Sequence, residues 1–168
     1  AYQRIVKRNK SILSLDPETP GKISAMLDEN SNLGVLNAVC SVLLEAVQVD
    51  PSPWHSASPK LIKVLAKVAN KELSRDHMYH SIPHPWLQVK CLRLLKFLPP
   101  EDSAASMTMT DQLRRILDSD STRLNSDNSK NAQNAVLFEA ISLINVLGGP
   151  LPVLQQTAVT QLGKFILA

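Results

Sequence analysis

Three histidines, His77, His80 and His84, form the group of side chains in this sequence that most resembles a metal site. Imidazole is a frequent ligand of zinc and other transition metals. Asp76 could join them, but no cysteine or cluster of carboxylates accompanies them, and Pro83 interrupts the helix that would align them. We interpret them as histidines of a solvated loop, and we predict no metal-binding, catalytic or cofactor-binding residue in this chain.

The sequence also lacks the short motifs of common enzyme classes. It contains no glycine-rich phosphate loop, no Gly-x-Ser-x-Gly and no His-Glu-x-x-His. Glu139 stands within an apolar helical pattern and could be taken for a catalytic acid, but no partner carboxylate is visible for it. We predict that Glu139 caps or pairs with a neighbouring helix, and that the protein is not an enzyme.

A row of lysines follows one face of a predicted helix. It can be an exposed face that charge keeps hydrated, or it can contact an acidic partner or an anionic lipid surface. The sequence leaves both interpretations open, so the partner-binding residues stay unknown at this stage. The row consists of Lys60, Lys63, Lys67 and Lys71, and the same alternatives apply to Arg4, Lys7, Arg8 and Lys10.

Two cysteines, Cys40 and Cys91, both fall within apolar helical patterns rather than in loops. Free cysteine is among the most buried residue types, and reduced thiols are typical of reducing compartments. The pattern favours a pair of buried, reduced thiols, with a disulfide between them as the alternative.

The composition indicates a helical protein of one domain. The chain has 168 residues, of which 44% are hydrophobic, while it has five glycines and 4% aromatic residues, a poor composition for a β protein. The formal net charge of +3 is too mild for a dedicated nucleic-acid domain, so we expect no nucleic-acid partner. No apolar run is long enough to cross a bilayer.

The most informative segment runs from Pro83 to Leu98. Pro85 suits the first turn of a helix, and Pro99 and Pro100 end it. We expect Trp86 to be a core anchor. Helical spacing places Lys90, Arg93 and Lys96 together on one side and an apolar set on another: Leu87, Cys91, Leu94, Leu95 and Leu98.

The remaining chain reads as further helices separated by polar or proline-rich loops. The helix at 33–49 carries one narrow polar stripe, which predicts a helix packed between others. In the helix at 131–147 we expect Leu137 and Phe138 to be buried. The predicted helices cover 2–15, 20–29, 33–49, 60–73, 85–98, 103–117, 131–147 and 152–167, the polar stripe is Asn37, Ser41, Glu45 and Gln48, and the predicted loops are 50–59, 74–84 and 118–130.

About eight helices and no convincing strand predict an all-α fold. Amphipathic helices alternate with strongly apolar ones, as in stacked helical hairpins. Such a chain forms an α-α superhelix, a helical solenoid of the HEAT or armadillo kind, and a closed helical bundle is the alternative.

Several motifs resemble the adaptin large-chain family. The resemblance begins with Pro-Trp-Leu-Gln-Val-Lys at 85–90, continues at Pro-Pro-Glu-Asp (99–102), and becomes specific at Leu-Phe-Glu-Ala-Ile-Ser-Leu-Ile (137–144). Leu-Gly-Lys-Phe at 162–165 extends it. Within the family these motifs look most like the alpha type of the plasma-membrane clathrin adaptor. Gamma-type chains are similar, but typically carry Phe at the position of Trp86.

The resemblance implies that residues 1–168 are one segment of an adaptin N-terminal trunk and a fragment of a longer chain. It implies a structural role in a heterotetrameric adaptor during clathrin-mediated endocytosis and vesicle-mediated protein transport. The implied partners are a small, a medium and a beta-type large chain, the clathrin coat and a phosphoinositide membrane surface. The implied location is cytoplasmic, peripheral on the plasma membrane at coated pits. The alternatives are a gamma-type adaptin, a nuclear-transport-type scaffold and a helical enzyme fragment.

Overall fold

The computed structural model describes residues 17–28, 30–69, 78–119, 124–148 and 151–166. The helix expected at 2–15, together with Lys71 and His77, lies outside the described residues. The described part of the chain is almost entirely helical, which confirms the all-α prediction. Its α-helices are α2 (Thr19–Ala25), α3 (Leu33–Ala46), α4 (Ser58–Ala69), α5 (Pro85–Phe97), α6 (Ser103–Leu117), α7 (Asp127–Leu147) and α8 (Pro152–Ile166).

Local signals in the sequence explain where several helices begin. Asn32 caps α3 by accepting a hydrogen bond of 2.7 Å from the backbone N–H of Gly34. Asp102 caps α6 in the same way through the N–H of Ala105, also at 2.7 Å. At the start of α5, Pro85 occupies the first turn, where its missing N–H costs no hydrogen bond.

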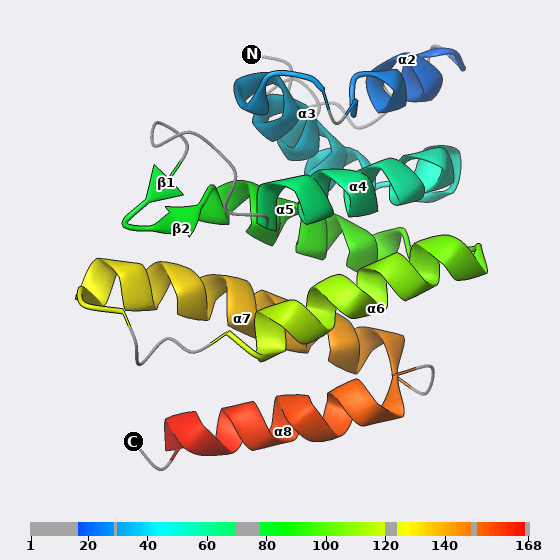
Figure 1. Cartoon of the computed structure of the whole chain (residues 1–168). Coiled ribbons are helices and arrows are strands. Elements are labelled where there is room, and N and C mark those ends of the chain that lie inside the picture. The colour runs from blue at the N-terminus through cyan, green and yellow to red at the C-terminus, as the bar shows by residue number, and fades with distance from the viewer. Residues whose placement is uncertain (1–16, 29, 70–77, 120–123, 149–150, 167–168) are drawn as a thin grey trace.

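The helices stack in two layers that run from the top to the bottom of Figure 1. One layer contains α3, α5 and α7, because α5 packs against both of the others. The second layer contains α4, α6 and α8, with α4 against α6 and α6 against α8. The layers join where α4 packs on α5, α6 on α7, and α7 on α8. This open stack has the form of the predicted solenoid rather than that of a closed bundle.

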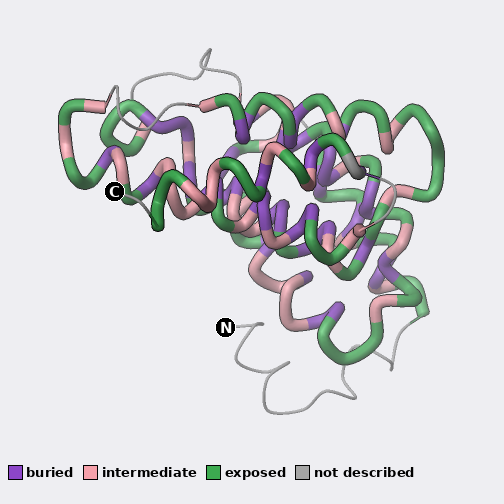
Figure 2. Tube along the Cα trace, turned by 90° about the horizontal axis from the view of Figure 1, so that it is seen from below, coloured by how far each residue is buried: buried purple, intermediate pink, exposed green. Residues whose placement is uncertain are grey.

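The core lies between the two layers and is continuous along the stack. Buried positions gather where helices face one another, and the outward turns are exposed (Figure 2). The sequence predicted the buried side of α5 correctly, and that side is supplied by Leu87, Cys91, Leu94, Leu95 and Leu98.

Two segments predicted as loops contain short regular structure. Residues 50–59 include the 3₁₀ helix η2 (Ser52–Ala57), which buries Trp54 and packs against α2. Residues 74–84 include an antiparallel hairpin of β1 (Met78–Tyr79) and β2 (Ile82–Pro83), in which Tyr79 pairs with Ile82. The expectation of no strand was therefore wrong for this short hairpin. Two-residue runs are too short to produce a periodic signal in sequence.

The helix predicted at 131–147 begins earlier in the structure than the sequence indicated. The sequence predicted a loop up to residue 130, whereas α7 begins at Asp127. Ser126 caps the helix by accepting a hydrogen bond of 3.1 Å from the backbone N–H of Ser129. The carboxylate of Asp127 lies in the first turn, where its negative charge interacts favourably with the positive end of the helix dipole. Polar residues that the sequence analysis assigned to a loop therefore form the cap and the first turn of this helix.

Two aromatic residues expected in the core are exposed instead. Trp86 is 52% exposed and Phe138 is 43% exposed. Trp86 points outward from the first turn of α5, on the opposite side from its leucines, so Trp54 and not Trp86 is the buried tryptophan. Phe138 follows the fully packed Leu137 by one residue, which turns its side chain about 100° around α7.

Leu137 and Phe138 are neighbours in sequence that differ in burial, so their alanine substitutions form a matched pair. We expect Leu137→Ala to lower the free energy of unfolding by about 2–5 kcal/mol, because it leaves a cavity in the core. We expect Phe138→Ala to cost about 1 kcal/mol or less, because an exposed aromatic residue loses less buried area. Denaturant unfolding of the two variants measures both values. A Phe138→Ala variant as unstable as Leu137→Ala would contradict the observed orientation of α7.

Candidate functional site

The first polar contact within the helical stack joins α5 to α3. The Lys90 ammonium donates hydrogen bonds to Asn37 Oδ1 at 2.7 Å and to Ser41 Oγ at 2.6 Å. It also reaches the backbone carbonyl of Asn37 at 3.3 Å. Asn37 and Ser41 belong to the polar stripe predicted on the 33–49 helix, so the stripe has a defined partner across the layer.

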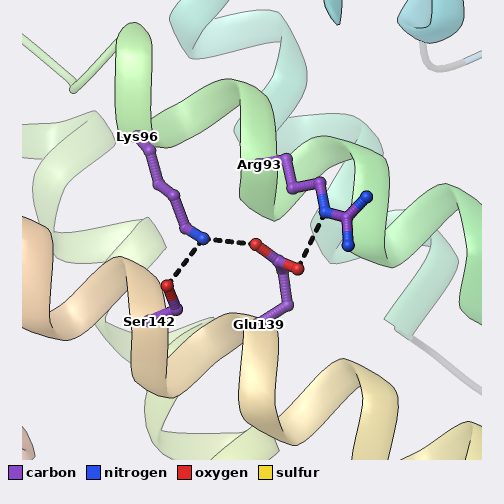
Figure 3. Close-up of polar contacts among 4 residues, drawn as sticks. All are labelled: Arg93, Lys96, Glu139 and Ser142. Atoms are coloured by element: carbon purple, nitrogen blue, oxygen red, sulfur yellow. Dashed lines mark hydrogen bonds and ion pairs between the residues drawn. The ribbon is translucent and has the colours of Figure 1, made fainter.

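The second polar contact joins α5 to α7. Glu139 accepts a hydrogen bond of 2.8 Å from Arg93 Nε through one carboxylate oxygen, and one from the Lys96 ammonium through the other. Lys96 also donates to Ser142 Oγ at 2.7 Å. Figure 3 shows these side chains meeting between the two helices. The prediction that Glu139 pairs with a neighbouring helix is confirmed.

These contacts determine the ionisation of Glu139. Partial burial raises the pKa of its carboxyl, but hydrogen bonds from Lys96 and Arg93 and the charges of both residues outweigh it, so the pKa lies below its usual value. Glu139 is therefore ionised at neutral pH. Because both oxygens already bond to cations, the carboxylate is placed to hold α5 and α7 together rather than to transfer protons.

Lys90 occupies a different environment. Partial burial lowers the pKa of its ammonium below the usual range, and no carboxylate bonds to it among the described residues. The partly buried Lys90 ammonium donates to neutral oxygens of α3 and so serves as a donor that joins the two helices. The pair of polar contacts, Lys90 on one side of α5 and Lys96 on the other, fixes how α3, α5 and α7 align.

A third side of α5 faces outward and presents large side chains. Trp86, Arg93 and Phe97 are exposed there, at spacings of seven and four residues that share one side of a helix. The ring of Tyr79, from the hairpin, lies 5.7 Å from that of Trp86. On α7, Phe138 contacts Phe165 of α8 with ring centres 4.8 Å apart. The sequence analysis missed these exposed aromatic residues because it assigned Trp86 and Phe138 to the core.

The lysine row does not form a uniform basic face. Lys60 donates a hydrogen bond of 3.0 Å to the backbone carbonyl of Ser24, at the end of α2. Lys63 is exposed, whereas Lys67 is only half-exposed. Of the three described lysines, one thus serves an internal contact, which favours the structural interpretation over a lipid-binding row.

The structure also places the two cysteines and two of the three histidines singled out in the sequence. Cys40 and Cys91 are free and buried, and contact with Cys40 together with burial raises the pKa of the Cys91 thiol. The disulfide alternative is therefore not favoured. His80 is exposed, and His84 precedes α5. Within the described ranges no three His, Cys, Asp or Glu side chains lie close enough to hold a metal ion.

Among the helices that the structure describes, none combines the length and the apolar character needed to cross a bilayer. The candidate site consists of two features of the helical stack. Polar contacts lie inside the α3–α5–α7 layer, and Trp86, Phe97 and the Arg93 guanidinium are exposed on the outward side of α5. The stacked pairs of helices define a helical-repeat scaffold.

Comparison with known proteins identifies the family. The model of the adaptin N-terminal region matches residues 3–168. The alpha-2 subunit of the AP-2 complex from Dictyostelium discoideum is 38% identical over 148 residues, covering 86% of this chain and 15% of that protein. The alpha-1 subunit of the AP-2 complex from Arabidopsis thaliana is 35% identical over 165 residues, covering 97% of this chain and 16% of that protein.

A gamma subunit of the AP-1 complex from Dictyostelium discoideum is 31% identical over 149 residues, covering 87% of this chain and 16% of that protein. The chain belongs to the adaptin family. It spans about one-sixth of the length of these curated relatives. Membership of this family removes the nuclear-transport and enzyme-fragment alternatives as family assignments.

The contact between α5 and α7 predicts a pH-dependent contribution to stability. We expect Glu139→Gln to lower the free energy of unfolding by about 1–3 kcal/mol at pH 7, because two charge-assisted hydrogen bonds are weakened. The folded-state pKa is lowered, so the wild-type advantage exists above the unfolded pKa of about 4.3 and disappears as the pH falls through the folded value. Denaturant unfolding of both proteins between pH 7 and pH 3 measures this difference.

Asp111→Asn is the matched control, because Asp111 forms an exposed pair with Arg114 on α6 at 3.6 Å. Such a surface pair contributes little, and we expect a cost below about 0.5 kcal/mol. If the two substitutions had equal effects, Glu139 would not hold the helices together.

The contact between α3 and α5 gives a second stability prediction. We expect Lys90→Met to cost about 1–2 kcal/mol, because the aliphatic stem is kept while Asn37 and Ser41 lose their donor. Lys63→Met, at an exposed position of α4, should change stability by less than about 0.5 kcal/mol. Thermal unfolding compares the two variants, and a larger loss for Lys63→Met would refute the role given to Lys90.

Proposed function

We propose that this chain is a segment, residues 1–168, of the N-terminal trunk of a clathrin adaptor large subunit. The observation that carries the proposal is the family match over residues 3–168, supported by alpha-subunit relatives that cover most of the chain. In this proposal the segment is architectural and not enzymatic. It holds other chains of a heterotetrameric adaptor during clathrin-mediated endocytosis and vesicle-mediated protein transport.

The arrangement of the helices supports an architectural role. Every helix of the α3–α5–α7 layer is tied to the next by buried leucines and by a polar contact, through Lys90 on one side and Glu139 on the other. Contacts at each step fix the alignment of successive helices in the layer. Its long sides also offer more surface to partners than a closed bundle of the same size.

The proposed partners are a small chain, a medium chain and a beta-type large chain, with clathrin and a phosphoinositide membrane contacted by the whole complex. The proposed location is the cytoplasmic side of the plasma membrane, at clathrin-coated pits. The relatives support these proposals because they are described as subunits of an AP-2 complex. The lysine row adds no support for lipid contact by this segment, since Lys60 is used within the fold.

A gamma-type adaptin is the second candidate, because a gamma subunit is 31% identical over most of the chain. The two candidates differ in the companions that they predict. An alpha-type chain assembles with the partners of the AP-2 complex, and a gamma-type chain with those of the AP-1 complex.

The test is affinity isolation of the tagged full-length protein from its own cells, followed by quantitative mass spectrometry. We expect one small chain, one medium chain and one beta-type large chain in equal molar amounts, with clathrin in addition. Recovery of AP-1 companions would favour the gamma-type candidate. Recovery of no adaptor chain in stoichiometric amount would overturn the proposed function while leaving the fold intact.

A further inference from the structure

An apolar groove of about 470 Å³ lies between α2 and α3. Figure 1 shows these two helices at one end of the stack, with no other described helix beyond them. Met26 is 48% exposed there, so a large apolar side chain stands open to solvent. The groove is lined by Thr19, Lys22, Ile23 and Met26 from α2 and its C-cap, and by Ala38, Val39 and Val42 from α3.

The side of α3 that lines the groove is not its polar side. The polar stripe turns toward α5, where Asn37 and Ser41 accept hydrogen bonds from Lys90. Ala38 is exposed and Val42 is half-buried, and their spacing of four residues places them on a common, apolar side. A helix packed against this side would place α3 between two others, as the narrow polar stripe predicts.

The order of the helices indicates which segment covers the groove. Along the chain, α3, α5 and α7 of one layer alternate with α4, α6 and α8 of the other. Because α2 packs against η2, and η2 against α4, α2 lies at the end of the second layer. Alternation then assigns the segment that precedes α2 to the first layer, beside α3, where the groove lies.

The sequence before α2 is amphipathic in the way that this position requires. In the helix predicted at 2–15, the apolar side chains gather within about a third of the circumference, with Asn9 as the polar residue among them. The cationic side chains fall on the opposite side. The apolar side consists of Tyr2, Ile5, Val6, Ile12 and Leu13, and the cationic side of Arg4, Lys7, Arg8 and Lys10.

The connection between this segment and the groove is short. Leu15 precedes Thr19, which lines the groove, by four residues. A chain of that length spans roughly 14 Å at most, so connectivity keeps the end of the segment near the groove. A short tether gives a roughly millimolar effective concentration, at which even a weak contact is occupied.

We propose that residues 2–15 form a helix that docks in the groove between α2 and α3 and completes this end of the α3–α5–α7 layer. Its apolar side covers Ile23, Met26 and Val42, and its cations face solvent. Docking does not depend on which complex the chain joins. A bilayer is the other surface that suits a basic amphipathic helix. The groove is the better partner because the chain itself holds the segment beside it.

A photo-cross-linking residue in the full-length protein tests the contact directly. p-Benzoylphenylalanine replaces Ile5, on the apolar side of the predicted helix, and mass spectrometry maps the cross-linked peptides after irradiation. We expect cross-links to Met26 and to the part of α3 that lines the groove. The matched control replaces Lys7, on the opposite side, and should give no cross-link to the groove.

Hydrogen–deuterium exchange of full-length variants tests whether the two surfaces protect each other. Met26→Gln/Ala38→Gln makes the groove polar at two exposed positions, and Ile5→Gln/Ile12→Gln makes the apolar side of the segment polar. We expect the groove variant to speed exchange in residues 2–15 by about tenfold or more, and the segment variant to speed exchange in α3.

Each variant has a matched control. Ala104→Gln/Met107→Gln changes the same residue types at exposed positions of α6, and Lys7→Gln/Ser14→Gln changes the opposite side of the predicted helix. Both controls should leave exchange in α3 and in residues 2–15 unchanged. The thermal midpoint shows whether each variant is folded, and the cross-link decides the question if a groove variant is not.

The contrary outcomes are distinct. Exchange that changes only around the substituted residues, with no effect across the groove, would overturn the inference. Cross-links from position 5 to another region of the chain, or to another protein, would also overturn it and would identify what the segment contacts instead. Protection of residues 2–15 that requires added phosphatidylserine vesicles would show that the segment binds a bilayer and not the groove.

Discussion

The structure depends on the burial of α5 among its neighbours. This helix packs against α3 and α7 within its own layer and against α4 in the other. Leu87, Leu94 and Leu95 are fully buried as a result. A helix that is apolar over so much of its circumference cannot persist alone in water. The hairpins on either side therefore stabilise one another, and the stack gains its stability from contacts between adjacent units.

Leucine packing alone would allow α5 to slide along its neighbours, and the polar contacts limit that freedom. Lys90 can meet Asn37 and Ser41 only in one alignment of α3 and α5. Glu139 imposes the same condition between α5 and α7, because an ammonium and a guanidinium approach it together. A partly buried ion left unpaired is costly, so shifted alignments are disfavoured even where their apolar contacts would be adequate.

Much of this organisation could be predicted from the sequence, because it rests on periodicity. The apolar side of α5 and the need of Glu139 for a partner both follow from the pattern of apolar and polar residues. Lys90 and Lys96 were expected together on one side of α5, but they bond to different neighbours, Lys90 to α3 and Lys96 to α7. Which residues meet across helices could not be predicted, since spacing on one helix does not fix the alignment of two. The hairpin around His80 was missed because it is too short for a pattern and its turn lacks glycine.

The errors at Trp86 and Phe138 have a common physical cause. Hydrophobicity favours burial, but it does not say which apolar side chains of a helix face the core and which face outward. Trp86 lies in the first turn of α5, away from its buried leucines, and Phe138 lies one residue beyond the buried Leu137 on α7. The contacts of Lys90 and Glu139 align α5 with α3 and α7, and this alignment decides which turns of α5 and α7 face outward.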